Sequence, residues 1–186
     1  MVITVGKNFN NLEVSTVTIS PFLLKQNISK LTIAINNKKS ELKKKSFKEL
    51  LSDFVPLKNF CYVDSIQDRK GVFRYITKEF KKAGIVTECF EQELEQRESM
   101  SSTAFGRVAL PHSIKMDARE SSGYIYINPK GIKWSGGTTV YLVIALAISA
   151  EDKGIFRKVF DTLSSIITNP INISKLIESK TYEELI

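Results

Sequence analysis

Alternating and continuous runs of apolar side chains predict the strands of this 186-residue chain. Residues Val14–Ser20 alternate apolar and polar side chains and are rich in β-branched types, which is typical of a half-buried strand. Residues Gly123–Asn128 place Tyr124 and Tyr126 on one face of a second strand. The consecutive apolar residues Val140–Ile148 predict a strand that is buried on both faces.

Elsewhere the apolar side chains recur every three or four residues, which predicts helices. Residues 68–82 and 88–99 show this spacing, and Gly84 suits the left-handed cap of the first of them. A wide apolar stripe predicts a further helix over residues 155–167, which Asn169-Pro170 ends. A last helix follows it, with a capping box at Thr181-x-x-Glu184.

These elements divide the chain into three predicted segments. Residues 1–36 hold one strand and a short helix, which is too little to bury a core. Residues 37–56 form a basic linker and a short helix, which the Ser46-x-x-Glu49 capping box starts after a polar break at residues 36–45. Residues 57–186 are predicted to form an α/β domain with a mixed β-sheet flanked by helices.

The net charge of +7 belongs to the first third of the chain. Residues 1–60 hold 10 Lys and Arg against 4 Asp and Glu, whereas residues 61–186 hold 17 against 16. Most of the excess is a cluster of lysines without interleaved aromatic residues or a helix-turn-helix pattern: Lys38, Lys39, Lys43, Lys44, Lys45 and Lys48. We interpret this cluster as a solvated linker face and expect no direct nucleic-acid binding by this chain.

Several function classes are excluded by what the sequence offers. The longest apolar run is far shorter than the ~20 residues that a bilayer helix needs, so we expect no membrane insertion. Cys61 and Cys89 lack metal-ligand spacing and are interpreted as small core residues. With one histidine in the chain, a metal site is not expected, and no cofactor is implied. Because the first residues lack a signal-peptide layout, we expect a cytosolic protein.

The only histidine, His112, lies in unusual surroundings. It follows an apolar run and Pro111, and Arg97, Ser102 and Thr103 lie upstream. A neutral imidazole can take a phosphoryl group in line, while a guanidinium and hydroxyl donors hold the phosphoryl oxygens. The alternative is a hydrogen-bonded, inert histidine at a strand end, and the pattern alone leaves both interpretations open.

The run Arg97–His112 resembles the signature of the fructose/mannitol-class enzyme IIA domain of the bacterial sugar phosphotransferase system. The matching positions are Arg-Glu, then Ser-Thr, then Gly, then an apolar run that ends in Pro-His. The resemblance extends over residues 57–186. It implies that His112 accepts phosphate from phospho-HPr, that Arg97 lies beside it as a catalytic residue, and that Ser102 and Thr103 bind the phosphate.

The sequence departs from that family at two places. Arg107 stands where a second glycine is usual, and Ile155-Phe156 replaces a His-Leu pair that supplies a second active-site histidine in many members. We therefore expect phosphate acceptance by His112 but poor transfer to an enzyme IIB domain.

The first segment is similar to the last strand and helix of the enzyme IIB-like domain that precedes enzyme IIA in BglG-type and mannitol-activator transcription regulators. The similarity is carried by Val14–Leu24 with Ile28 and Leu31. It implies that residues 1–36 are the end of such a domain and that the chain is the C-terminal part of a sugar-operon regulator or antiterminator, with the other domains of that polypeptide as partners. A transport enzyme IIA that passes phosphate to a fructose- or mannitol-class IIB domain is the alternative, and a binding module that is never phosphorylated is a third.

The remaining motifs carry less chemistry. Gly136-Gly137 is interpreted as a turn before a buried strand, and Trp134 as a packing residue. The glutamates of the predicted helix at residues 88–99 are interpreted as a solvated face: Glu91, Glu93, Glu95 and Glu98.

Overall fold

The computed structural model describes residues 2–5, 16–19 and 25–185. The chain divides into two compact units, Met1–Ser46 and Phe47–Ile186. Helix α1 (Lys25–Phe54) begins in the first unit and ends in the second.

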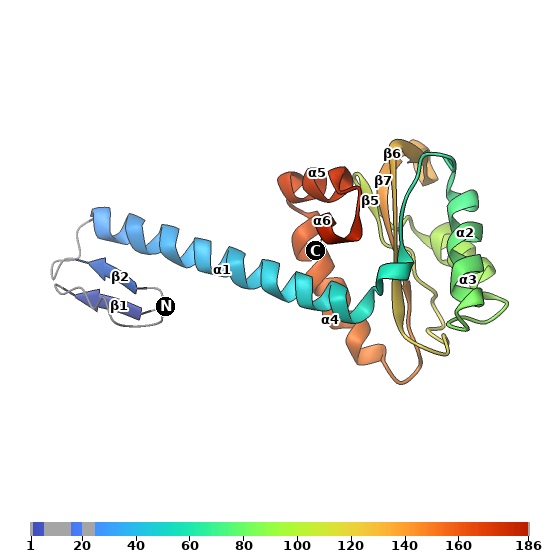
Figure 1. Cartoon of the computed structure of the whole chain (residues 1–186), viewed down its shortest axis with the longest axis horizontal. Coiled ribbons are helices and arrows are strands. Elements are labelled where there is room, and N and C mark those ends of the chain that lie inside the picture. The colour runs from blue at the N-terminus through green and yellow to red at the C-terminus, as the bar shows by residue number, and fades with distance from the viewer. Residues whose placement is uncertain (1, 6–15, 20–24, 186) are drawn as a thin grey trace. The chain divides into compact units, whose positions relative to one another are not determined.

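The first unit contains a two-stranded parallel sheet and the start of α1 (Figure 1). Strand β1 (Val2–Val5) pairs in parallel with β2 (Thr16–Ile19), and the hydroxyls of Thr4 and Thr18 are 2.9 Å apart. The strand predicted at residues 14–20 is thus confirmed where the structure describes it. Residues 14, 15 and 20 lie outside the described residues.

Helix α1 corrects the predicted organisation of residues 36–56. It continues through residues 36–45, so the predicted polar break is wrong, and so is a helix start at Ser46. The break contains neither proline nor glycine, and its lysines, glutamate and leucine are good helix formers, so polarity alone does not end the helix. The last turn packs into the second unit, where Leu51 and Phe54 are buried.

The second unit is built on a mixed five-stranded sheet with the order β3-β6-β7-β5-β4. Its strands are β3 (Phe60–Tyr62), β4 (Ala104–Phe105), β5 (Val108–Ala109), β6 (Ser122–Lys133) and β7 (Thr139–Ala147). β3 and β6 are parallel, as are β5 and β7, whereas β6 pairs with β7 and β4 with β5 in antiparallel fashion. The predicted mixed sheet is confirmed.

Helices cover both faces of this sheet (Figure 1). One face carries α2 (Arg69–Lys82) and α3 (Phe90–Met100). The other carries α4 (Lys153–Ile167), α5 (Pro170–Glu178) and α6 (Tyr182–Leu185). Two short 3-10 turns, η1 (Leu57–Asn59) and η2 (Ser135–Gly137), connect elements. The predicted α/β fold is therefore confirmed, including the strand that is buried on both faces.

The structure differs from the predicted strands in two respects. β6 runs past Pro129 to Lys133, because a register shift between Ile127 and Ile132 takes up the intervening residues. Gly131 lies in that shift with a φ of 88°, a conformation that favours glycine. The short strands β4 and β5 were not predicted, since two residues show no periodicity.

The structure tests the predictions for Trp134, for Gly136-Gly137 and for the two cysteines. Trp134 is buried edge-on against Phe73, and Gly136-Gly137 forms a turn with positive φ, as predicted. Cys61 is half-buried against the core, but Cys89 is exposed, so its interpretation as a core residue is wrong.

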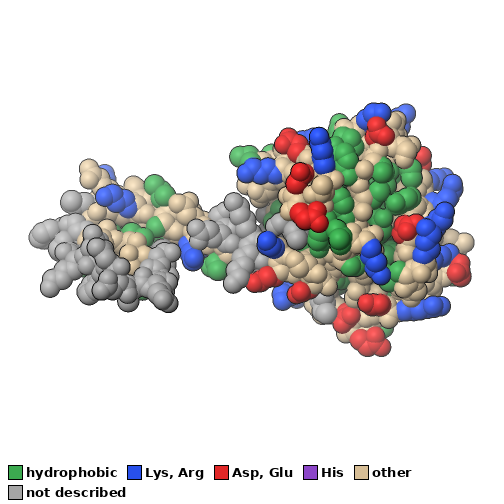
Figure 2. All heavy atoms as spheres, in the orientation of Figure 1, with side chains coloured by type: hydrophobic (Ala, Val, Ile, Leu, Met, Phe, Trp, Pro, Cys, Tyr) green, Lys and Arg blue, Asp and Glu red, His purple; other side chains and the backbone are tan. Residues whose placement is uncertain are grey.

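The surface of this unit carries side chains of both signs of charge, as Figure 2 shows for one face. This agrees with its nearly balanced composition. Among the described helices, none combines the length and the apolar character that a membrane crossing requires.

Candidate functional site

His112 lies three residues after the end of β5, the strand next to the central strand β7. The carbonyl of Pro111 accepts a hydrogen bond from Leu146 of β7 at 2.9 Å, and His112 itself forms a bridge to Leu146. His112 is only 9% exposed. The strand order thus fixes the backbone of His112 against a buried central strand.

The two ring nitrogens of His112 have different partners. Nδ1 is 2.9 Å from the carbonyl oxygen of Leu110, and since a carbonyl can only accept, Nδ1 carries the proton. Nε2 is 3.2 Å from Nε of Arg97, which donates to it. The neutral ring therefore directs a lone pair, on Nε2, toward the guanidinium.

Burial acts most strongly on the charge of His112 and lowers the pKa of its imidazole below the ordinary value. The Leu110 carbonyl opposes this, and the positive charge of Arg97 adds to it. The ring is consequently neutral, and able to act as a nucleophile, at neutral pH.

Two phenylalanine rings from α4 lie close to the imidazole of His112. The ring centroid of Phe156 is 5.1 Å from that of His112, and Phe160 is 6.4 Å away. Phe160 also contacts Phe105 of β4, at 6.3 Å between centroids. The α4 side chains that the structure shows at His112 are thus Phe156 and Phe160. The side chain of Ile155 lies outside the described residues.

Arg97 lies in the last turn of α3, as the predicted partner of His112. Besides its bond to the imidazole, its guanidinium donates to the carbonyl of Ser101 at 2.9 Å. This second bond orients the guanidinium edge that faces Nε2. The structure therefore brings together the two residues that the resemblance assigns to catalysis.

Ser102 and Thr103 follow α3 and both donate to the carboxylate of Glu98. Ser102 Oγ is 3.0 Å from one carboxylate oxygen, and Thr103 Oγ1 is 2.6 Å from the other. Ser102 is exposed, whereas Thr103 is 2% exposed. The two hydroxyls predicted to bind phosphate thus lie on the loop beside the site and bond to a carboxylate.

The glutamates of α3 are not uniformly solvated, which corrects their interpretation. Glu93 and Glu98 are 5% and 3% exposed, respectively. Sequence reasoning missed Glu98 because a glutamate between polar neighbours gives no periodic signal of burial. The Ser102-Thr103 pair, which follows Glu98 by four and five residues, could have indicated its burial, since a buried carboxylate needs nearby hydrogen-bond donors.

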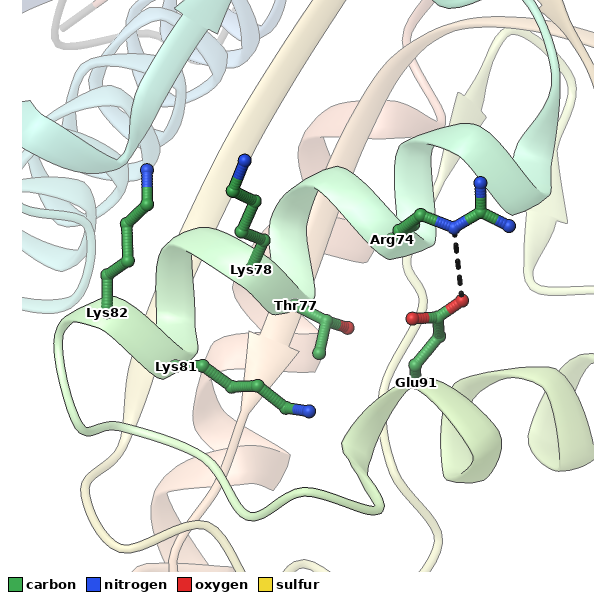
Figure 3. Close-up of a pocket in the computed structure, with 6 residues that line it drawn as sticks. All are labelled: Arg74, Thr77, Lys78, Lys81, Lys82 and Glu91. Carbon is green, nitrogen blue, oxygen red and sulfur yellow. Dashed lines mark ion pairs between the residues drawn. The ribbon is translucent and has the colours of Figure 1, made fainter.

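A separate pocket of about 560 Å³ lies along α2, and its lining includes none of the residues around His112. Figure 3 shows Lys78 and Lys82 on one side of α2, and Arg74 and Lys81 on the side where α3 carries Glu91. Arg74 is 3.9 Å from Glu91, and Lys81 and Lys82 pair with Glu88 and Glu79. Most of its cations are therefore balanced locally. No cluster of metal-ligating side chains occurs among the residues that the structure describes.

Comparisons with known proteins agree with this geometry. The family described as "Phosphoenolpyruvate-dependent sugar phosphotransferase system, EIIA 2" matches residues 57–186. The probable licABCH operon regulator of Bacillus subtilis is 24% identical over 139 residues, covering 74% of this chain and 22% of that protein. The transcriptional regulator ManR of the same organism is 27% identical over 169 residues, covering 89% of this chain and 26% of that protein.

The chain spans about a quarter of the length of these two regulators. A solved complex of the mannitol enzyme IIA with the phosphorylated mannitol enzyme IIB of Escherichia coli contains a chain of the same fold. Its TM-score is 0.60 at 17% identity, over 70% of this chain and 93% of that one. Since the family match covers well over half of its residues, the protein belongs to the EIIA type 2 family of the phosphoenolpyruvate-dependent sugar phosphotransferase system.

Proposed function

We propose that Nε2 of His112 accepts a phosphoryl group from phospho-HPr and that the phosphorylated domain controls a sugar-operon regulator of which this chain is part. The observation that carries the proposal is the hydrogen-bond pattern of the imidazole. Nδ1–H is held by Leu110, and the lone pair of Nε2 faces Arg97.

Phosphoryl transfer on this geometry is an in-line displacement. Nε2 forms the new bond to phosphorus while the donor's bond to phosphorus breaks, and the electron pair of that bond leaves with the donor. The attacking ring keeps its Nδ1 proton and gains positive charge. The carbonyl of Leu110, 2.9 Å from Nδ1, stabilises that charge.

Arg97 moves from ground-state partner to phosphoryl ligand in this step. Its Nε–H must release Nε2 before the bond to phosphorus forms, and it then donates to a phosphoryl oxygen. The bond from its guanidinium to Ser101 keeps it beside the reacting atoms. Ser102, which is exposed, can turn its hydroxyl from Glu98 to the phosphoryl group. Thr103 is too deeply buried to do so without opening the loop.

Exposed apolar side chains around the site provide a surface for a protein donor. Met100, at the end of α3, is 70% exposed, and Ile114, two residues after His112, is 45% exposed. Phe105 is 47% exposed and contacts the ring of Phe160, which in turn contacts the imidazole. Aromatic residues and methionine are enriched in protein interfaces, so we assign these exposed apolar side chains to the docking of HPr.

Two observations favour regulation over transport. The match to ManR covers more of this chain than residues 57–186, so it includes part of the first unit. In addition, Phe156 offers no hydrogen-bond donor to a phosphoryl group on His112, which favours a long-lived phosphorylated form. A phosphohistidine that loses its phosphoryl group slowly suits a regulatory signal.

Residues 1–36 fit the end of an enzyme IIB-like domain, which is part of this proposal. A parallel strand pair normally has both faces covered, yet Val2, Ile3 and Val5 of β1 are all exposed. If residues 1–36 are only the end of such a domain, the strand pair lacks its covering elements. Hydrogen exchange on this 186-residue chain should then show the amide protons of β1 exchanging with solvent within minutes. Slow exchange there would contradict this assignment.

The function is tested by incubating the protein with enzyme I, HPr and phosphoenolpyruvate. One acid-labile phosphate per chain is expected on the wild type and none on His112→Gln, which keeps a polar side chain of similar size. Because the sequence has one histidine, acid-labile label on the variant would refute the assignment.

Transport, the alternative, is tested by mixing the labelled protein with fructose- and mannitol-class IIB domains. We expect slow loss of label, and faster loss after Phe156→His, which places an imidazole beside His112, than after Ile155→His. Rapid and complete discharge of the wild type to one IIB domain would make the protein a transport enzyme IIA.

A further inference from the structure

Helix α3 contributes a buried carboxylate next to Arg97. Glu98 accepts hydrogen bonds from the backbone N–H of Thr103 at 3.0 Å and from the hydroxyls of Thr103 and Ser102. Burial acts to raise the pKa of Glu98, but these donors and Ser135 outweigh it, and the pKa lies below its usual value. Glu98 is therefore an ionised side chain that organises the loop after α3.

That loop connects Glu98 to the imidazole through the backbone. The carbonyl of Thr103 accepts the N–H of Leu110 at 3.0 Å, and the carbonyl of Leu110 accepts Nδ1–H of His112 at 2.9 Å. Each link joins residues that the fold has already brought side by side. The position of the Leu110 carbonyl thus depends on the loop that Glu98 holds.

A second carboxylate of α3, that of Glu93, bonds to the residues that follow His112. Glu93 accepts a hydrogen bond from the hydroxyl of Ser113 at 2.6 Å, and Lys115 pairs with it at 3.1 Å. Ser113 is thus bonded directly to α3, and Leu110 is connected to α3 through Thr103 and Glu98. One rigid helix, which also carries Arg97, sets the frame for the reactive ring.

We propose that Glu98 and Thr103 are positioning residues that fix the Nδ1–H tautomer of His112. The inference rests on the proposed function in one respect, that Nε2 is the atom that accepts the phosphoryl group. If the Leu110 carbonyl shifts, the proton divides between Nδ1 and Nε2, and each molecule with the proton on Nε2 has no lone pair there to attack. Thr103 then acts through Leu110 and not as a phosphate ligand.

The test uses the whole chain and the fact that His112 is its only histidine. Nitrogen-15 NMR of the imidazole reports the tautomer and the pKa of one residue without any phosphoryl transfer. The variants are Thr103→Val, which removes the hydroxyl but keeps the shape, Thr103→Ser, which restores it, and Glu98→Gln. Glu91→Gln, on the same helix and outside the network, is the matched control.

We expect the Nδ1–H tautomer to dominate in the wild type, in Thr103→Ser and in the control. Thr103→Val and Glu98→Gln should give mixed tautomers and a rate of phosphorylation by phospho-HPr that is lower by about tenfold. Unchanged tautomers and rates in variants that melt like the wild type would overturn the proposal.

An Nε2–H tautomer in the wild type would overturn it as well, and this measurement needs no variant to fold. If the wild type shows the expected tautomer but takes up no phosphate, the proposed function fails while the positioning role stands. The two failures are therefore distinguishable.

Discussion

Replacing Arg97 by lysine tests whether the guanidinium acts in the transfer. Arg97 uses two different groups at once, Nε toward His112 at 3.2 Å and its terminal nitrogen toward Ser101 at 2.9 Å. A lysine has one ammonium on a flexible chain and cannot hold both partners in one plane. It keeps the positive charge, so the lost quantity is directional hydrogen bonding.

The magnitude follows from what one charged hydrogen bond contributes. Losing it in the transition state costs about 1.5–3 kcal/mol, which corresponds to a rate about 10- to 150-fold lower. The bond to Ser101 is exposed, and its loss should lower the melting temperature by less than about 4 °C. We therefore expect Arg97→Lys to slow phosphorylation at least tenfold while the melting temperature changes little.

The assay is single-turnover transfer from purified phospho-HPr, followed by acid-labile label on the chain, with melting measured on the same samples. Arg74→Lys is the control, because Arg74 lies on α2 with a side chain 75% exposed and a weak pairing to Glu91. A normal rate for Arg97→Lys together with a large loss of stability would refute the reasoning and make Arg97 a structural residue.

Two further predictions concern stability. Because burial holds the pKa of folded His112 below the ordinary value of 6.5, the unfolded chain takes up that proton first, so the contribution of His112 to stability is complete above about pH 6.5 and is lost as the pH falls below it. Urea unfolding between pH 8 and 5.5 should show this loss in the wild type and less of it in His112→Gln; identical pH profiles would contradict the assigned pKa direction. Gly131→Ala should destabilise the second unit by about 2 kcal/mol or more, since its φ is +88° and a Cβ would lie 2.6 Å from Thr139 Cγ2. Gly136→Ala, with a φ of +65° and open space around its Cβ, should cost about 1 kcal/mol, and an equal cost for both would show that the contact with Thr139 is unimportant.

The sequence predicts the elements of the second unit well where a pattern is long. Helix α2 begins after its Asp68 cap and ends before Gly84, as the periodicity and the cap residues indicate. The apolar run at residues 140–148 forms nearly all of the central strand β7. Its side chains pack into the core on both faces of the sheet, which is why the run has no polar positions. Strands β4 and β5 have two residues each, so they show no periodicity, and β5 also depends on pairing with β7, which is distant in sequence.

The candidate site was predicted in its centre but not in its surroundings. Proximity of Arg97 and His112 followed from a motif sixteen residues long, and the structure places the two in hydrogen-bond contact. The buried state of Glu98 and the contact of Phe156 with the imidazole depend on tertiary packing. Sequence reasoning interpreted Glu98 as solvated, and it placed Ile155-Phe156 at the position of a missing histidine without indicating that the Phe156 ring contacts His112.

The most direct measurement of the central claim is the chemical identity of the phosphorylated nitrogen. Nitrogen-15-labelled protein is phosphorylated with enzyme I, HPr and phosphoenolpyruvate, and the coupling to phosphorus is read on the single imidazole. We predict coupling at Nε2, with the proton remaining on Nδ1 beside Leu110. Coupling at Nδ1, or a phosphorylated chain whose imidazole shows no coupling at all, would contradict it.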